Sequence, residues 1–206
     1  PGTIAGNDGF AKSVCLWLNE LRVTDYDKND GWATTGRVNL KLADFAVVNM
    51  SGKYSTPGFG SIEQKISERS RETFGTFSIS SNVVLDKILP KKLGLKIPMF
   101  VSYENTTITP KFDPLNPDVQ VALIPRTGKY KDIDYKSFIQ DRTEKKAINF
   151  TNVSKVKAGG SKKSYPWDPE NLNFTFSRSE IIRSNVNIQA YNSINTIYAA
   201  GYVFNS

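Results

Sequence analysis

The feature that most constrains the fold of this chain is the period of two in its apolar residues. Between residues 95 and 103 an apolar side chain stands at every second position, and 172–177 repeats the pattern. Such alternation gives a strand one apolar and one polar face, whereas a helix needs a period near 3.6. A helical pattern is weak and confined to 131–142. The sequence therefore predicts an all-β fold with about eight strands.

The remaining strand candidates follow from the same alternation. Around Asp44 the phase is blurred, which indicates either a β-bulge or one long strand with a two-sided apolar middle. Pro98 cannot donate a backbone hydrogen bond, so it belongs at an edge, a bulge or a strand start. The further segments with strand character are 12–23, 37–42, 48–53, 73–88, 145–156, 185–191 and 194–204.

The connections predicted between these strands differ in length. The polar turn at 25–31 is short, whereas the loops at about 55–72, 104–144 and 157–170 are long and rich in Pro and Gly. Long loops on one side and short turns on the other are typical of outer-membrane barrels. A β-sandwich with elaborate binding loops has the same composition, so both architectures stay open at this point.

Composition excludes several classes of function. The 206 residues include 27 Lys and Arg, 20 Asp and Glu, no His and a single cysteine, Cys15, with a net charge of +7. Without His there is no imidazole-based catalytic triad or zinc site, and one Cys cannot form an internal disulfide. No apolar run reaches the roughly 18 residues of a membrane helix. Because the chain begins at Pro1, it is either a processed chain or a piece of a longer one, and we expect it to be one segment, 1–206, of something longer.

The excess of basic residues does not by itself indicate nucleic acid. Lys and Arg are dispersed, the densest group being 155–163, and no nucleic-acid-binding motif accompanies them. Attraction to anionic lipid or to phosphates of an outer leaflet explains the charge equally well. We therefore expect no nucleic-acid partner.

Two loop regions carry candidate chemistry. Gly58 and Gly60 alone are a weak signal for a phosphate-binding loop. The charged cluster that follows is either a paired network, a polar constriction or a solvated loop; it comprises Glu68, Arg69, Arg71 and Glu72.

The second region offers oxygen ligands, and calcium is conceivable there. The candidate ligands are Asp113, Asn116, Asp118 and Asp168. Their spacing fits no EF-hand, and the prolines between them favour a rigid turn. No carboxylate pair can be identified as a catalytic dyad, so we expect no enzyme activity, no cofactor and no metal.

A series of motifs in a fixed order resembles the SprA/Sov family. Each motif alone is unspecific, but together they cover most of residues 15–185. They are Leu18-Asn-Glu-Leu-Arg22, Gly31-Trp-Ala33, Ala43-Asp-Phe45, Ser55-Thr-Pro-Gly-Phe-Gly60, Glu68-Arg-Ser-Arg-Glu72, Lys96-Ile-Pro-Met-Phe-Val-Ser-Tyr103, Thr109-Pro-Lys-Phe-Asp-Pro114, Ile148-Asn-Phe-Thr-Asn-Val153 and Asp168-Pro-Glu-Asn-Leu172.

The resemblance implies a function in protein export. Members of this family form the outer-membrane translocon of the type 9 secretion system of Bacteroidetes, which also serves gliding motility. They are very large single-chain barrels that pass folded cargo to the cell surface. By this resemblance the chain is an arc of up-and-down antiparallel strands in the barrel wall, located in the outer membrane of a Gram-negative cell. The implied partners are cargo proteins with a C-terminal secretion signal, plug and shuttle proteins of the system, and membrane lipid or lipopolysaccharide.

A barrel wall would give the two faces of each strand different roles. The polar positions expected to line a hydrated lumen are Arg37, Asn39, Lys41, Ser78, Ser80, Asn173, Thr175 and Ser177. The apolar positions expected to face lipid are Leu95, Ile97, Met99 and Val101. Aromatic residues that belong either to an interface girdle or to ordinary packing are Trp17, Trp32, Tyr54, Tyr103 and Trp167.

A second interpretation comes from a different class of protein. All-β chains with long loops also occur as secreted or cell-surface modules that recognise glycan or protein through those loops. Such a module would be monomeric in plain buffer, whereas a segment of a pore would need detergent.

Overall fold

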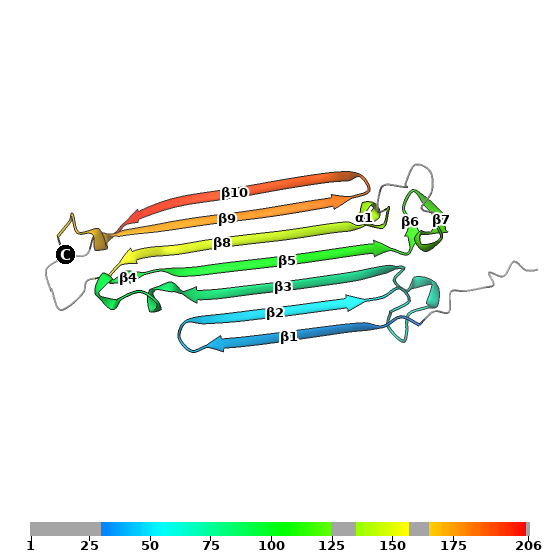
Figure 1. Ribbon diagram of the computed structural model, residues 1–206, viewed down its shortest axis with the longest axis horizontal. Coiled ribbons are helices and arrows are strands. Elements are labelled where there is room, and N and C mark those ends of the chain that lie inside the picture. The colour runs from blue at the N-terminus through cyan, green and yellow to red at the C-terminus, as the bar shows by residue number, and fades with distance from the viewer. Residues whose placement is uncertain (1–29, 125–134, 157–164, 205–206) are drawn as a thin grey trace, which may run out of the picture.

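The computed structural model describes residues 30–124, 135–156 and 165–204, and its main feature is one large antiparallel sheet (Figure 1). The prediction of an all-β fold is confirmed. The long strands are β1 (Ala33–Leu42), β2 (Ala46–Ser55), β3 (Glu72–Val84), β5 (Pro98–Pro110), β8 (Asp141–Lys155), β9 (Leu172–Asn185) and β10 (Ile188–Tyr202). The short elements are β4 (Leu95–Lys96), β6 (Phe112–Asp113), β7 (Asn116–Gln120), α1 (Tyr135–Ile139) and the 3-10 turns Ile66–Glu68, Leu85–Lys87, Lys91–Leu93, Val121–Leu123 and Pro169–Asn171.

The long strands are neighbours in the order in which they follow one another along the chain. The sheet runs β1-β2-β3-β5-β8-β9-β10, and β4 pairs with β8 beside it. Every pairing is antiparallel, so the sheet is an up-and-down meander. Within the described residues, β1 and β10 each have one edge without a strand partner.

The blurred segment around Asp44 is a tight hairpin, so both sequence interpretations of it were wrong. Leu42 pairs with Ala46, and the Phe45 amide donates to the Leu42 carbonyl over 3.0 Å. Ala43 has φ of 46°, a left-handed conformation that closes the reversal. Because apolar residues stand on both sides of the turn, the alternation pattern gives no sign that the strand ends at Leu42.

The loops do not divide into long ones on one side and short ones on the other. Because the strands alternate in direction, the 43–45 hairpin, the connection 85–97, the end of β8 and the start of β9 lie at one end (Figure 1). The connection 56–71, the segments 111–124 and 135–140 and the turn after Asn185 lie at the opposite end. The predicted strand 185–191 is wrong because it spans that turn, where Asn185 Oδ1 accepts the amides of Asn187 and Ile188.

The connection predicted at 104–144 is shorter in the structure. β5 continues to Pro110 and β8 begins at Asp141, because the polar residues at these strand ends pair with one another across the two strands instead of forming a loop. Within the connection, β6 and β7 form a two-stranded sheet, and α1 lies inside the range 131–142 where the sequence shows a weak helical pattern. Pro98 opens β5, which confirms a strand start.

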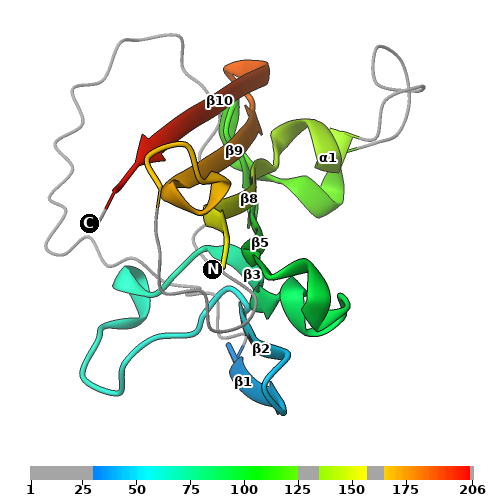
Figure 2. The same cartoon turned by 90° about the vertical axis from the view of Figure 1, so that its left-hand side faces the viewer.

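The sheet forms a single layer, with α1 beside it (Figure 2). In the described parts of the chain, only Ala46 and Ile139 are buried apolar side chains, so the long strands enclose no core of their own. No helix among these residues is long and apolar enough to cross a membrane. The predicted strand at 12–23, Cys15, Trp17 and most of the 25–31 turn lie outside the described residues.

Candidate functional site

The pairing register fixes which side chains share a face of the sheet. Directly opposed residues of an antiparallel pair point to the same side, and successive residues of a strand point to opposite sides. We call one side of the sheet the polar face. In β1, β2 and β9 the odd-numbered residues point to this face, and in β3 and β5 the even-numbered residues do. The odd-numbered residues of β8 up to Asn149 and of β10 from Tyr191 also point to it. The opposite side is called the apolar face.

All eight residues that the sequence assigned to a lumen lie on the polar face. Arg37, Asn39 and Lys41 come from β1, and Ser78 and Ser80 come from β3. Asn173, Thr175 and Ser177 come from β9, on the far side of the sheet. One row across the whole sheet is Asn39, Asn49, Ser80, Ser102, Ala147, Ser179 and Asn195.

Short polar side chains on this face bond across neighbouring strands. The hydroxyls of Ser51 and Ser78 are 2.7 Å apart, and those of Thr76 and Thr106 are 3.0 Å apart. Ser177 Oγ donates to Asn149 Oδ1 over 2.5 Å. Such bonds satisfy the groups locally and leave a face whose remaining donors and acceptors can bind water.

Charge on the polar face is unevenly spread. On β1 and β2 its charged residues are Arg37, Lys41 and Lys53, all cations. On β5 and β8, Lys145 Nζ lies 2.9 Å from Glu104 Oε1. The β1–β2 hairpin therefore presents a positive polar surface.

Three of the four residues predicted to face lipid lie on the apolar face. Met99 and Val101 are placed there by their pairing with Phe150 and Ile148. Val153 lies on the apolar face because it pairs with Phe174, so Lys155, two positions later, lies there too. Leu95 shares this face because it pairs with Lys155. Ile97 lies in the one-residue break between β4 and β5, where no pairing fixes its face.

Within the described residues, no other layer covers the apolar face. One of its rows reads Leu42, Ala46, Val83, Met99, Phe150, Phe176 and Tyr198. Leu42 is 49% exposed, Val101 36% and Tyr198 76%. An exposed face on which large apolar side chains predominate indicates contact with lipid or with another protein.

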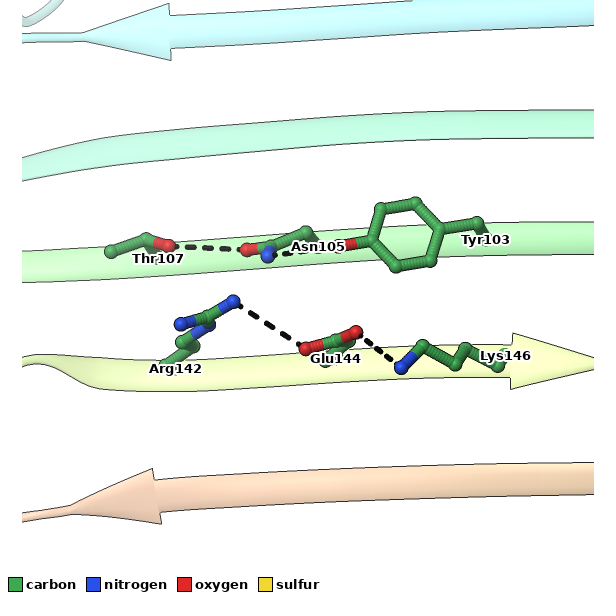
Figure 3. Close-up of polar contacts among 6 residues, drawn as sticks. All are labelled: Tyr103, Asn105, Thr107, Arg142, Glu144 and Lys146. Carbon is green, nitrogen blue, oxygen red and sulfur yellow. Dashed lines mark hydrogen bonds and ion pairs between the residues drawn. The ribbon is translucent and has the colours of Figure 1, made fainter.

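A polar cluster interrupts the apolar face near one end of β5 and β8 (Figure 3). Glu144 accepts from Lys146 Nζ at 2.8 Å and from Arg142 at 3.4 Å. Directly opposite on β5, Asn105 donates to Tyr103 Oη over 3.3 Å and accepts from Thr107 Oγ1 over 3.2 Å. The sequence analysis missed this cluster because it began the strand at 145, although charges at positions 142, 144 and 146 already share the strand's period of two.

A groove of about 510 Å³ opens on the apolar face across β1, β2, β3 and β5. Its floor is the bare backbone of Gly36, Gly52 and Gly75, and the rings of Tyr54 and Phe77 flank it. Asn105 and Thr107 of the polar cluster line its β5 side. The groove is therefore apolar along most of its length and has hydrogen-bonding groups on its β5 side.

Two of the suggested calcium ligands, Asp113 and Asp168, support turns. Asp113, only 3% exposed, accepts bonds from the Leu115 amide, Asn116 Nδ2 and Tyr135 Oη at 3.0, 3.2 and 2.9 Å. Burial raises the pKa of Asp113, but these hydrogen bonds together outweigh it and the pKa lies below its usual value. Asp168 Oδ2 accepts from the Tyr165 amide over 2.8 Å. No group of three acidic or sulfur ligands suited to a metal occurs in the described ranges.

The charged loop residues do not form the paired network that the sequence suggested. Glu68 ends a 3-10 turn and Glu72 begins β3, so the chain carries them apart. Within the described residues, no ion pair joins Glu68 or Glu72 to Arg69 or Arg71. The side chain of Arg69 instead packs beside Gly60, and its Nε is buried.

Comparison with models of protein families gives a match. A family model named SprA_N, described as a motility related/secretion protein, matches residues 2–123, more than half of the chain. The match extends from before β1 through β7 and so includes the glycine groove. A search of the curated proteins finds no match.

Proposed function

Because this chain belongs to the SprA_N family of motility-related and secretion proteins, we propose that it forms part of the wall of an outer-membrane pore that exports folded proteins. The pore would belong to a type 9 secretion system and serve secretion and gliding motility. Its cargo would carry a C-terminal secretion signal, and plug and shuttle proteins would control its opening.

The observation that carries the proposal is the single-layer sheet with two unlike faces. Among the described residues no second layer covers its apolar face, and its polar face consists mainly of hydroxyls, amides and charged groups. A sheet that separates lipid from water requires this division. The strands of 10 to 15 residues are long enough, since about 9–11 tilted residues cross a bilayer.

The open edges of the sheet fit a position inside a larger wall. In lipid, every backbone N–H and C=O must find a partner, and only closure of the strands provides it. β1 and β10 would therefore each pair with a further strand of the barrel. A sheet left open at both edges, with an apolar face, would aggregate.

Transport through such a wall needs no catalytic group. A face rich in Ser, Thr and Asn side chains holds water and offers a moving protein little apolar contact, so cargo would bind weakly and could pass. Selection would then depend on pore width, on wetting and on the proteins that gate the opening.

The test uses two adjacent residues of β5 that lie on opposite faces. In a Cys15→Ser background, Val101→Cys and Ser102→Cys are produced in the secreting cells and treated with a membrane-impermeant maleimide. We expect Ser102→Cys to react in intact membranes and Val101→Cys to react only after detergent solubilisation and unfolding. Ser80→Cys carrying a bulky polyethylene glycol should also slow export of cargo.

Other outcomes would contradict the pore. If both cysteines reacted equally and the protein fractionated without membrane, a cell-surface binding module would replace it. If Ser80→Cys carrying the polymer exported cargo at the normal rate, the polar face would not line the transport path.

A further inference from the structure

We propose that the glycine-floored groove on the apolar face binds one phosphate-bearing membrane lipid, with an acyl chain in the groove and the phosphate at Arg142. The inference rests on the proposed function, because it requires the apolar face to meet the bilayer. It adds a specific lipid site to a surface otherwise suited to general contact with lipid.

The shape of the groove suits a hydrocarbon chain. A side chain on Gly36 would meet no atom within 4 Å, so the backbone there is open to an occupant. Phe77 pairs with Gly52, and Tyr54 pairs with Gly75, so each ring stands beside a bare glycine. Between aromatic walls and a backbone floor, an acyl chain gains contact area that a flat sheet does not offer.

Polar groups begin where the groove ends. Thr107 and Asn105 line its β5 side and lie directly opposite Arg142 and Glu144 of β8. Directly opposed side chains have Cβ atoms about 4.5–5.5 Å apart. A lipid whose chain fills the groove would therefore bring its ester and phosphate groups against Thr107, Asn105 and Arg142.

Arg142 retains the capacity to bind phosphate. Glu144 lies closer to Lys146, at 2.8 Å, than to Arg142, at 3.4 Å, and the Arg142 side chain is 54% exposed. Its contact with Glu144 uses one terminal nitrogen, whereas a guanidinium carries five N–H donors in a fork that matches phosphate.

The position of the site on the sheet favours a lipid over a soluble ligand. The groove is continuous with the apolar face and lies at the end of β2 and β3 where Trp32 and Tyr54 pack with ring centroids 5.2 Å apart. Such amphipathic rings concentrate where hydrocarbon meets headgroups. Strands in membrane barrels tilt by about 35–45°, so an acyl chain would cross several strands, as this groove does.

The experiment uses the protein purified from its own membranes into nanodiscs. The probes are phosphatidylglycerol, lipid A and uncharged diacylglycerol, each with a photoactivatable acyl chain. We expect both phosphate-bearing probes, or one of them, to cross-link to peptides containing Tyr54 or Phe77, and diacylglycerol to cross-link weakly. A preference for lipid A over phosphatidylglycerol would identify the outer-leaflet lipid as the occupant.

Two variants and two matched controls test the residues. Gly36→Leu fills the groove and should abolish cross-linking, whereas Val38→Leu, the next residue on the same face, should not. Arg142→Gln should weaken binding of phosphate-bearing probes about fivefold, the effect of one cation near a lipid surface. Arg183→Gln removes an arginine from the polar face and should leave cross-linking unchanged.

Failure of this site can be distinguished from failure of the pore. Equal cross-linking of all three probes, or cross-linking unchanged in Gly36→Leu, would overturn the lipid site while the Val101 and Ser102 cysteines still reported a membrane wall. Equal reactivity of those two cysteines would overturn the pore itself.

Discussion

Tyr54 lies directly opposite Gly75 across β2 and β3, and a ring carbon of Tyr54 is 3.6 Å from the place where a side chain on Gly75 would begin. The tyrosine therefore covers backbone that the glycine leaves bare. The ring also packs against Trp32, with centroids 5.2 Å apart. The Tyr54 ring therefore holds β2, β3 and the segment before β1 together at the edge of the groove.

Removing the Tyr54 ring should weaken the contacts between these strands. We expect Tyr54→Ala to lower the free energy of unfolding by about 1 kcal/mol, the upper range for a cross-strand pair with an aromatic residue. Tyr191→Ala is the matched control, because Tyr191 lies opposite Arg183 instead of a glycine. Denaturation in detergent, followed by gel mobility, measures both variants, and an equal loss would contradict a special role for the Tyr54–Gly75 pair.

A charged side chain should lower the stability of the folded protein much more on the apolar face of β5 than on its polar face. Val101→Arg places a cation on the apolar face, where arginine near the bilayer midplane costs about 2–4 kcal/mol in a membrane barrel. Ser102→Arg places the same side chain on the polar face and should change stability by about 0.5 kcal/mol or less. The yield of folded protein in the membrane fraction tests the contrast. Equal yields would mean that the apolar face does not meet lipid.

The alternation within single strands was sufficient to predict the fold class and the polar face. Arg37, Asn39 and Lys41 share one side of β1 because a strand has a period of two, and this holds whatever its neighbours are. The same reasoning could not determine which strands adjoin, because register depends on hydrogen bonds between distant segments. That these residues lie on the same side as Asn173 and Ser177 follows only from the register across the whole sheet.

The turn at Ala43 and the polar cluster on β5 and β8 could not be predicted from the sequence for a different reason. The hairpin at Ala43 has apolar residues on both sides, so no change in composition marks it. The cluster of Tyr103, Asn105, Arg142 and Glu144 brings together segments about 40 residues apart, since Asn105 pairs with Glu144. Neither feature has a local signal that differs from an ordinary strand.

Two glycines should respond in opposite ways to alanine. Gly94 has φ of +58°, and a side chain there would lie 2.3 Å from the Val156 carbonyl oxygen, so Gly94→Ala strains the backbone and separates β4 from β8. We expect a loss of at least about 1 kcal/mol. Gly36 lies in a strand with open space around it, so Gly36→Ala should stabilise by up to about 1 kcal/mol. Thermal unfolding compares the two variants, and a destabilising Gly36→Ala would contradict the open floor of the groove.

Acid should open the small unit of β6, β7 and α1 before it affects the sheet. The pKa of Asp113 is lowered in the folded protein, so its carboxylate contributes stability that is fully present above the ordinary aspartate pKa of about 3.9 and is lost as the pH falls below it. Protonation weakens the bonds from the Leu115 amide, Asn116 and Tyr135. Protection of the Leu115 amide, measured against the intrinsic exchange rate at each pH, should therefore fall as the pH drops below about 4, while amides in β9 stay protected. Asp113→Asn is the control, because it retains an acceptor without a titrating group and should exchange at a pH-independent protection level. A wild-type protection level that stayed constant over the same range would show that the Asp113 carboxylate does not hold this turn.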